Sequence, residues 1–171
     1  MDFKQHIRTI PDFPIPGIQF RDITTVLKEP AALKASIEAM EKHLAGIDFD
    51  LVIGPESRGF IFGVPLAMAM NKGFVPARKP GKLPADTISK TYALEYGTNT
   101  IELHADAIKP GQRIVIADDL LATGGTSQAI CELVKEAGAQ VVANVFFIEL
   151  LDLPGREVLK DYGQVFSVVQ Y

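Results

Sequence analysis

Cysteine is nearly absent from this chain, and so are long apolar runs and any basic excess. The one cysteine, Cys131, excludes an intramolecular disulfide and fits a reducing cytosol. The longest apolar run, residues 60–70, is too short to span a bilayer and contains Gly63 and Pro65. The N-terminal segment has no apolar signal-peptide core. These absences predict a cytoplasmic protein that does not associate with a membrane.

Positive charge is also scarce, since 17 Lys and Arg residues face 21 Asp and Glu residues for a net charge of −4. Nucleic-acid-binding domains usually carry a basic excess, so this balance disfavours a nucleic-acid partner. It does not disfavour a polyanionic small substrate, provided that the positive side chains converge locally. Neither G-x-x-x-x-G-K-[ST] nor G-x-G-x-x-G occurs, which excludes the P-loop and dinucleotide fingerprints.

One stretch of the sequence, residues 113–128, carries the main functional signal. Residues 113–117 form a short, mostly β-branched apolar run after the turn Pro110–Gly111, which predicts a buried strand. Two carboxylates, Asp118 and Asp119, end this strand, and a loop of small residues leads from it into a helix with apolar residues at helical spacing. Backbone N–H groups of a glycine-rich loop and a helix N-terminus bind phosphate, whereas carboxylates accept hydrogen bonds from sugar hydroxyls. This order of features predicts a site for a phosphorylated polyol.

Strand-like and helix-like segments alternate along the rest of the chain. We expect residues 2–9 to form one or two helical turns and residues 11–17 to be extended, because three prolines fall within six residues. The predicted helices cover residues 30–44 and 60–71 and follow residue 128; the predicted strands cover residues 49–53, 74–77, 113–117, 141–147 and 165–169.

This pattern predicts an α/β fold with a central, mostly parallel, twisted sheet of about five strands flanked by helices. We expect a single domain over residues 1–171. A small N-terminal hood at about residues 1–30 would precede the sheet. Two extended segments, residues 88–96 and 100–104, predict a flexible hairpin lid within about residues 79–105.

The stretch IVIADDLLATGGT, residues 114–126, resembles the motif for phosphoribosyl pyrophosphate (PRPP) of the type I phosphoribosyltransferases. Four further blocks resemble the adenine-specific members of that family: PDFPIPGIQFRDI from residue 11, GPESRGF from residue 54, RKPGKLP from residue 78 and YALEYG from residue 92. Members acting on 6-oxopurines typically carry an aspartate where this chain has Ala122, which also favours adenine. The resemblance implies the reaction adenine + PRPP ⇌ AMP + pyrophosphate, with Mg²⁺ bound by the diphosphate.

The resemblance also assigns expected roles to individual residues. Asp118 and Asp119 would hold the ribose hydroxyls, with contact to Mg²⁺ at most through water and no direct metal ligand. The loop after them would hold the 5′-phosphate, and four basic residues would bind pyrophosphate. The phosphate-binding set is Ala122, Thr123, Gly124, Gly125 and Thr126; the pyrophosphate set is Arg58, Arg78, Lys79 and Lys82. A solvated basic loop remains an alternative for Lys79 and Lys82, and Pro80 replaces a basic residue found in some relatives.

The expected base site and lid rest on the same resemblance. Gln19 and Arg21 would recognise adenine through their backbone groups, Phe20 would stack on the base, and Leu150 would close its opposite face. Glu95 would handle the proton of the purine ring as a catalytic group beside Arg58, when the lid closes. Tyr92 and Tyr96 flank Glu95 and would either exclude water or contact phosphate. Phe20 could equally be a core aromatic, and Glu95 an exposed hairpin acid.

Two other functions stay open from the sequence. The first is transfer to a different base, and the second is a PRPP-sensing regulator that keeps the fold without catalysis. Such a regulator usually needs a nucleic-acid-binding surface, which this acidic chain does not suggest. The family is usually dimeric, so the resemblance also implies a homodimer.

Overall fold

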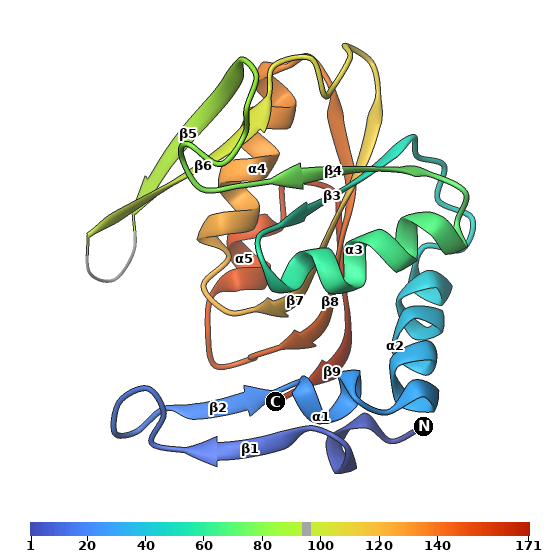
Figure 1. The fold of residues 1–171 in the computed structure, drawn as a ribbon, viewed down its shortest axis with the longest axis vertical. Coiled ribbons are helices and arrows are strands. Elements are labelled where there is room, and N and C mark those ends of the chain that lie inside the picture. The colour runs from blue at the N-terminus through green and yellow to red at the C-terminus, as the bar shows by residue number, and fades with distance from the viewer. Residues whose placement is uncertain (94–96) are drawn as a thin grey trace. The chain divides into compact units, whose positions relative to one another are not determined.

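The computed structural model describes residues 1–93 and 97–171 and divides into two compact units, residues 1–39 and 40–171 (Figure 1). Among the described helices, none has both the length and the apolar character needed to cross a membrane. The larger unit contains the predicted sheet, and each unit is described in turn.

The larger unit is built on five parallel strands in the order β4-β3-β7-β8-β9. Their bounds are β3 Leu51–Pro55, β4 Gly73–Ala77, β7 Arg113–Leu121, β8 Gln140–Glu149 and β9 Gln164–Gln170. The predicted parallel sheet of five strands is therefore confirmed. The central strand β7 continues four residues beyond the predicted end at Ala117, because Asp118 and Leu120 pair with Phe146 and Ile148 of β8.

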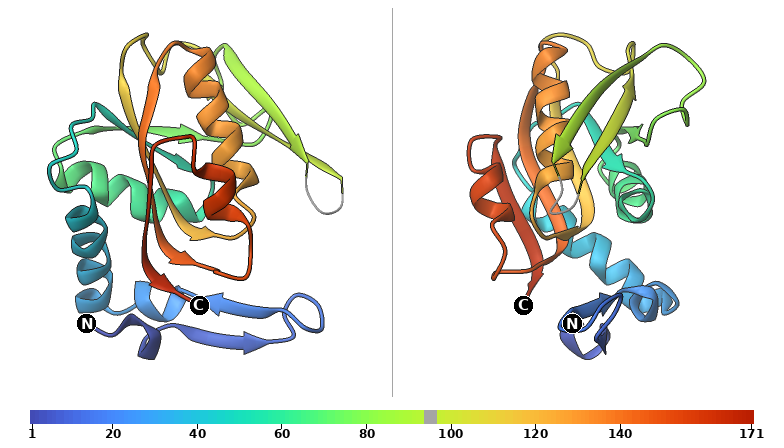
Figure 2. Two further views of the ribbon diagram at one scale, coloured as in Figure 1. Left: turned by 180° about the vertical axis from the view of Figure 1, so that it is seen from behind. Right: turned by 90° about the vertical axis from the view of Figure 1, so that its left-hand side faces the viewer.

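Three helices connect these strands: α3 Arg58–Ala69, α4 Gly125–Glu136 and α5 Gly155–Leu159. The chain moves from β3 to β4 in one direction across the sheet and from β7 through β8 to β9 in the other. Right-handed crossovers then place α3 on one face and α4 and α5 on the opposite face (Figure 2). The direction in which successive strands are added reverses between β3 and β7. At such a switch point, an open α/β sheet has a crevice at the carboxyl ends of its strands.

The core lies on both faces of the sheet, because the strands carry apolar residues on both sides. Ile114 and Ile116 belong to the cluster formed with α4, and both are fully buried. On the other face, Phe62 of α3 stacks on Phe147 of β8 with ring centroids 5.1 Å apart. Cys131 of α4 is buried and unpaired, as expected for a core residue of a helix.

An antiparallel hairpin, β5 Thr87–Ala93 and β6 Thr98–His104, occupies the region predicted to be a lid. Its base is part of the core rather than an exposed flap, since Ile101 and Leu103 are buried. Lys90 also bridges to α4, with its Nζ 2.9 Å from Glu132 Oε2 and 2.7 Å from Glu136 Oε1. The closing motion of this hairpin stays a prediction.

The smaller unit begins with a 3-10 turn, η1 Phe3–Gln5, and a hairpin of β1 Arg8–Pro11 and β2 Gln19–Asp22. Helix α1 Thr24–Leu27 follows, and α2 Pro30–His43 starts in this unit. The prediction of helical turns over residues 2–9 was wrong beyond Gln5, because residues from Arg8 onward pair with β2. The prediction that residues 11–17 are extended was wrong beyond Pro11, because the following residues form the turn that joins β1 to β2. Asp12 has a φ of 56°, and its Oδ1 accepts a hydrogen bond of 2.8 Å from Gly17 N across this turn.

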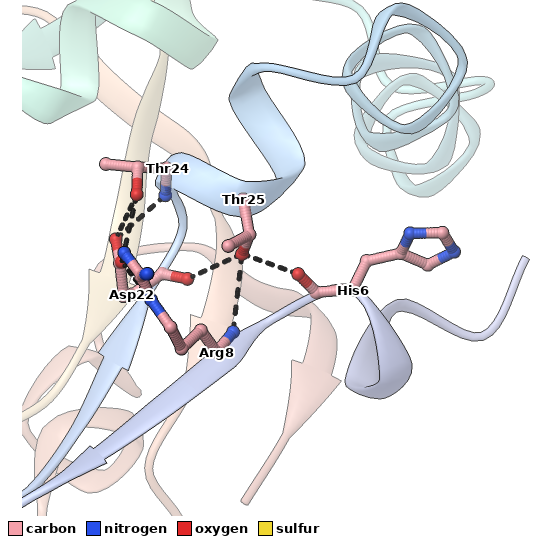
Figure 3. Close-up of polar contacts among 5 residues, drawn as sticks. All are labelled: His6, Arg8, Asp22, Thr24 and Thr25. Carbon is pink, nitrogen blue, oxygen red and sulfur yellow. Dashed lines mark hydrogen bonds and ion pairs between the residues drawn. The ribbon is translucent and has the colours of Figure 1, made fainter.

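A buried carboxylate, Asp22, joins β1, β2 and α1 (Figure 3). Its Oδ1 accepts hydrogen bonds from the Thr24 backbone N–H at 2.9 Å and hydroxyl at 2.7 Å, and Oδ2 pairs with the Arg8 guanidinium, whose Nε lies 2.9 Å away. Thr25 Oγ1 extends the network to His6, donating to its carbonyl oxygen at 2.6 Å. The Thr24 backbone hydrogen bond, then the Arg8 contact, lower the pKa of Asp22 from 3.8 to about 2.

We expect Asp22→Asn to lower the free energy of unfolding of this unit by about 2 kcal/mol at neutral pH, following the pKa difference. A carboxyl group whose pKa is depressed by folding stabilises the fold above its unfolded pKa. That stabilisation is lost as the pH falls from 3.8 through about 2. Urea unfolding followed by circular dichroism, with hydrogen exchange of residues 8–27, measures the difference at pH values on either side of this window.

The control for Asp22→Asn is Asp12→Asn, because Asp12 is exposed and an asparagine oxygen still accepts the Gly17 hydrogen bond. Its φ of 56° is also tolerated by asparagine. A loss of stability that is equal in the two variants, or that does not shrink at acid pH, would contradict the role of the Asp22 charge.

Candidate active site

The functional residues predicted from the central motif lie where β3 and β7 end side by side. Strand β3 leads through Glu56 and Ser57 into α3, and β7 leads through residues 122–124 into α4. The peptide bond between Glu56 and Ser57 is cis. Both connections therefore open onto the crevice at which the direction of winding reverses.

The loop after β7 forms a small hollow of about 90 Å³, lined by Asp118 and residues 120–127. Gly124 caps α4 with a φ of +84°, and α4 begins at Gly125, slightly earlier than the apolar pattern predicts. The first N–H groups of a helix have no partner within the helix and attract anions. The hollow thus has the size and the donors for one phosphate group, and the binding of phosphate by Ala122 to Thr126 stays a prediction.

Close packing of backbone against backbone fixes this loop. Gly155 N, at the start of α5, donates to the Ala122 carbonyl oxygen at 3.0 Å. A Cβ on Gly124 would lie 3.0 Å from both Cα and O of Gly155. From the hairpin side, the Tyr92 hydroxyl lies 2.9 Å from Thr126 Oγ1. The loop is therefore held by α5 and by β5, and the predicted lid residue Tyr92 contacts the predicted phosphate site.

The two carboxylates and Arg58 converge across the crevice. Arg58, the first residue of α3, places its Nε 2.9 Å from Asp119 Oδ2. Asp118 Oδ1 accepts a hydrogen bond of 2.8 Å from the Asp119 N–H and approaches α3 at Gly59. A Cβ on Gly59 would lie only 2.9 Å from that oxygen, so glycine makes room for the carboxylate. Arg58, Asp118 and Asp119 thus belong to one site.

Burial is the main cause of the unusual titration of the two aspartates. It raises the pKa of Asp118 well above its usual range, and the adjacent Asp119 charge raises it further. Burial also raises the pKa of Asp119, although the Arg58 cation opposes that rise. Two carboxylates that resist ionisation together are typical of a site that receives a ligand.

The basic segment after β4 is organised by two glutamates. Arg78 donates to Glu56 Oε2 from Nε at 3.2 Å and from Nη2 at 3.0 Å, and the Lys79 N–H donates to Glu56 Oε1 at 2.6 Å. Glu102 Oε2 accepts a hydrogen bond of 3.2 Å from Gly81 N. Burial works to raise the pKa of Glu56, but the hydrogen bonds from Lys79 and Arg78 outweigh it and leave the pKa below its ordinary value. Lys79 and Lys82 are exposed.

The residues predicted to bind adenine or to form the lid lie on several different elements. Leu150 follows β8, and its N–H donates to the Leu121 carbonyl oxygen at 3.0 Å, beside the start of the phosphate loop. Three predicted adenine contacts, Gln19, Phe20 and Arg21, lie on β2 in the smaller unit. There Phe20 packs edge-on against Phe13, with ring centroids 5.1 Å apart. Glu95 and Tyr96 lie outside the described residues, and their roles stay predictions.

Two residues of this site were not predicted from the sequence. Glu56 stands within the GPESRGF block, but its contact with Arg78, 22 residues further along the chain, has no local signal in the sequence. For Gly155, no local signal indicates its contact with Ala122. Within the described ranges, no group of three His, Cys, Asp or Glu side chains is placed to hold a metal ion.

Comparison with known proteins first defines the class. A family model of the phosphoribosyl transferase domain matches residues 22–169. The parallel sheet, the crevice and the phosphate loop described above all lie within the matched range. The fold and the site therefore define a phosphoribosyltransferase.

Individual relatives identify the family within this class. The adenine phosphoribosyltransferase of Lachnoclostridium phytofermentans is 56% identical over 168 residues, which cover 98% of this chain and 96% of the relative. The crystal structure of adenine phosphoribosyltransferase from Thermoanaerobacter pseudethanolicus matches with a TM-score of 0.96 at 52% identity, covering 99% of this chain and 98% of that one. The adenine phosphoribosyltransferase from Saccharomyces cerevisiae was crystallised with an imino-altritol bisphosphate and adenine. It matches with a TM-score of 0.92 at 38% identity, covering 98% of this chain and 96% of that one. The chain belongs to the adenine phosphoribosyltransferase family.

Proposed function

We propose that this chain transfers the phosphoribosyl group of PRPP to adenine, forming AMP and pyrophosphate and so salvaging a free purine base. The observation that carries the proposal is the crevice between β3 and β7. There a phosphate-sized hollow, two adjacent carboxylates and Arg58 lie together. Membership of the adenine phosphoribosyltransferase family supports the choice of base.

The parts of this site match the parts of PRPP. The 5′-phosphate would occupy the hollow at the N-terminus of α4, and Asp118 and Asp119 would accept hydrogen bonds from the ribose hydroxyls. Bond breaking at ribose C1 leaves positive charge on the sugar and negative charge on the departing pyrophosphate. Arg58, Arg78, Lys79 and Lys82 would stabilise that negative charge. The Arg58 pairing with Asp119 gives way when pyrophosphate and ribose bind.

Magnesium fits this site as a partner of the substrate. Asp118 and Asp119 supply the carboxylate oxygens that Mg²⁺ accepts, but Asp119 is already paired with Arg58. The described residues offer no cluster that would hold the ion by protein ligands alone. We therefore propose that Mg²⁺ arrives on the diphosphate of PRPP and reaches the aspartates through water, neutralising charge on the leaving group.

Base recognition is proposed to use β2 and Leu150. Gln19 and Arg21 would present backbone groups to adenine, whose N6 donor and N1 acceptor match a carbonyl and an N–H. Phe20 would stack on the base, and Leu150 would contact its other side. The yeast relative, whose crystal contains adenine, supports an adenine site in this family. Glu95 would exchange the proton on the purine ring, with Tyr92 and Tyr96 excluding water.

The oligomeric state, the location and the partners of the protein are also part of the proposal. A homodimer in the cytoplasm fits the resemblance to the family and the single, buried cysteine. Partners are limited to adenine and PRPP, without nucleic acid or membrane.

In the presence of Mg²⁺, we expect adenine and PRPP to yield pyrophosphate and AMP. With hypoxanthine, guanine, xanthine, uracil or orotate in place of adenine, we expect no pyrophosphate release above background. A coupled pyrophosphate assay and chromatography of the nucleotide product measure this. Release with a different base would retain the phosphoribosyltransferase assignment and reject adenine as the acceptor. Tight PRPP binding without release with any base would favour the PRPP-sensing regulator.

A further inference from the structure

Helix α5 has no assigned role in the reaction, yet its first residue holds the phosphate loop. Gly155 N donates to the Ala122 oxygen at 3.0 Å. A Cβ on Gly155 would lie 2.3 Å from that oxygen and 2.6 Å from Leu121 Cδ1. The backbone of α5 therefore touches the loop with no intervening side chain, so a displacement of α5 displaces the loop.

The next residue, Arg156, anchors α5 to the sheet. Its Nε and Nη2 donate to the two oxygens of Glu149 at 2.7 and 2.6 Å, and its Nη1 donates to the Val165 carbonyl oxygen at 2.7 Å. Glu149 is the last residue of β8 and is only 2% exposed. Arg156 thus joins α5 to the end of β8 and the start of β9, and it follows directly after the residue that contacts the loop.

The carboxylate of Glu149 is held on every side. Ser167 Oγ donates to its Oε2 at 2.5 Å, and Gln170 Nε2 donates to the same oxygen at 3.2 Å. A two-pronged arginine–carboxylate contact fixes the relative orientation as well as the distance of its partners. The hydrogen bonds from Arg156 lower the pKa of Glu149, so the pair stays ionised and does not exchange protons at neutral pH.

We propose that Arg156 and Glu149 are positioning residues for the phosphate loop, residues 122–126, and that the affinity for the ribose 5-phosphate end of PRPP depends on them. The inference rests on the proposed function for the identity of the ligand. Neither side chain touches the hollow, which is lined by Asp118 and residues 120–127. Both act through Gly155, and neither acts on the pyrophosphate side, where Arg58 and Arg78 lie.

Two ligands report separately on binding at the two ends of PRPP. Ribose 5-phosphate reports on the hollow, and inorganic pyrophosphate reports on the basic residues. We expect Arg156→Gln to weaken ribose 5-phosphate binding about tenfold and to raise the KM for PRPP, while pyrophosphate affinity and the KM for adenine change less than about twofold. Arg156→Lys keeps the charge but loses the two-pronged contact, so we expect an intermediate loss. Isothermal titration calorimetry and steady-state kinetics on the full chain measure these values.

The matched control is Arg113→Gln. Arg113 begins β7, at the opposite end of the sheet, and its Nη2 lies 2.7 Å from Asp48 Oδ2. Its side chain is 38% exposed, close to the 45% of Arg156, so this variant controls for the loss of a half-exposed guanidinium. Its partner Asp48 is exposed, whereas Glu149 is buried, so the cost of leaving a buried carboxylate unpaired is judged instead from the comparison of the two probes in Arg156→Gln. We expect Arg113→Gln to leave the affinity for both probes unchanged.

Three outcomes overturn the inference: unchanged ribose 5-phosphate binding in Arg156→Gln, equal weakening of both probes, or the same loss in Arg113→Gln. If Arg156→Gln does not fold, Arg156→Lys and Ser167→Ala decide the matter by the same two-probe comparison. A wild-type chain that binds neither ribose 5-phosphate nor PRPP would instead reject the proposed function.

Discussion

We expect Arg58→Gln to lower kcat/KM for PRPP by about 10³, the upper range for removing one donor that stabilises charge in a transition state. Arg58 stands at the first position of α3, across the crevice from Asp119, with 2.9 Å between its Nε and Asp119 Oδ2. Glutamine keeps polarity and approximate length but loses the cation that would receive pyrophosphate. Initial rates with PRPP varied at saturating adenine measure the change.

The same variant has a second signature in its pH profile. Arg58 opposes the rise in the pKa of Asp119, so removing the cation raises that pKa further. If ionised Asp119 is needed to bind ribose, the acid limb of kcat/KM for PRPP moves to higher pH in Arg58→Gln. Arg58→Lys is the matched control, because it retains the charge and should keep the acid limb in place. Activity of Arg58→Gln within tenfold of wild type would reject its role at the pyrophosphate.

The sheet was predictable because its signals are local. The strand at Ile114 and Ile116 is β-branched and apolar on both faces, as a strand covered by helices on both sides must be. Its true end was not predictable, since Asp118 and Leu120 are kept in the strand by pairing with β8, about thirty residues further along the chain. The same dependence on a distant partner explains why the strand from Arg8 was mistaken for a helical turn.

The site was predictable where one continuous motif carries it. Asp118, Asp119 and the loop to Thr126 occupy consecutive positions, so the strand, loop and helix they form bring them together without help from the rest of the chain. The contact of Glu56 with Arg78 joins residues that follow two different strands, β3 and β4, and the contact of Gly155 with Ala122 depends on how two backbones cross. Neither leaves a pattern in the sequence near the residues concerned.

We expect Gly124→Ala to lower kcat/KM for PRPP about a hundredfold, mainly through a higher KM, because small displacements of a binding loop carry effects of this size. Gly124 adopts a φ of +84°, which costs an alanine about 1–2 kcal/mol. The added Cβ would also lie 3.0 Å from Cα and O of Gly155 and 3.3 Å from Val158 Cβ. Since the first two contacts are with backbone, the phosphate loop or α5 must move. Kinetics with PRPP varied, and titration with ribose 5-phosphate, measure the result.

Gly111→Ala separates the effect of backbone strain from the effect of the displaced loop in Gly124→Ala. Gly111 has nearly the same φ, +82°, but a Cβ there would have no neighbour within 4 Å. Alanine at position 111 therefore introduces the same backbone strain before β7 without displacing the phosphate loop. We expect both variants to melt at lower temperature, with the larger decrease and a raised KM for PRPP in Gly124→Ala, because only that variant adds close contacts to the strain. A raised KM in both variants would attribute the effect to backbone strain, and an unchanged KM in Gly124→Ala would show that the hollow tolerates movement of its loop.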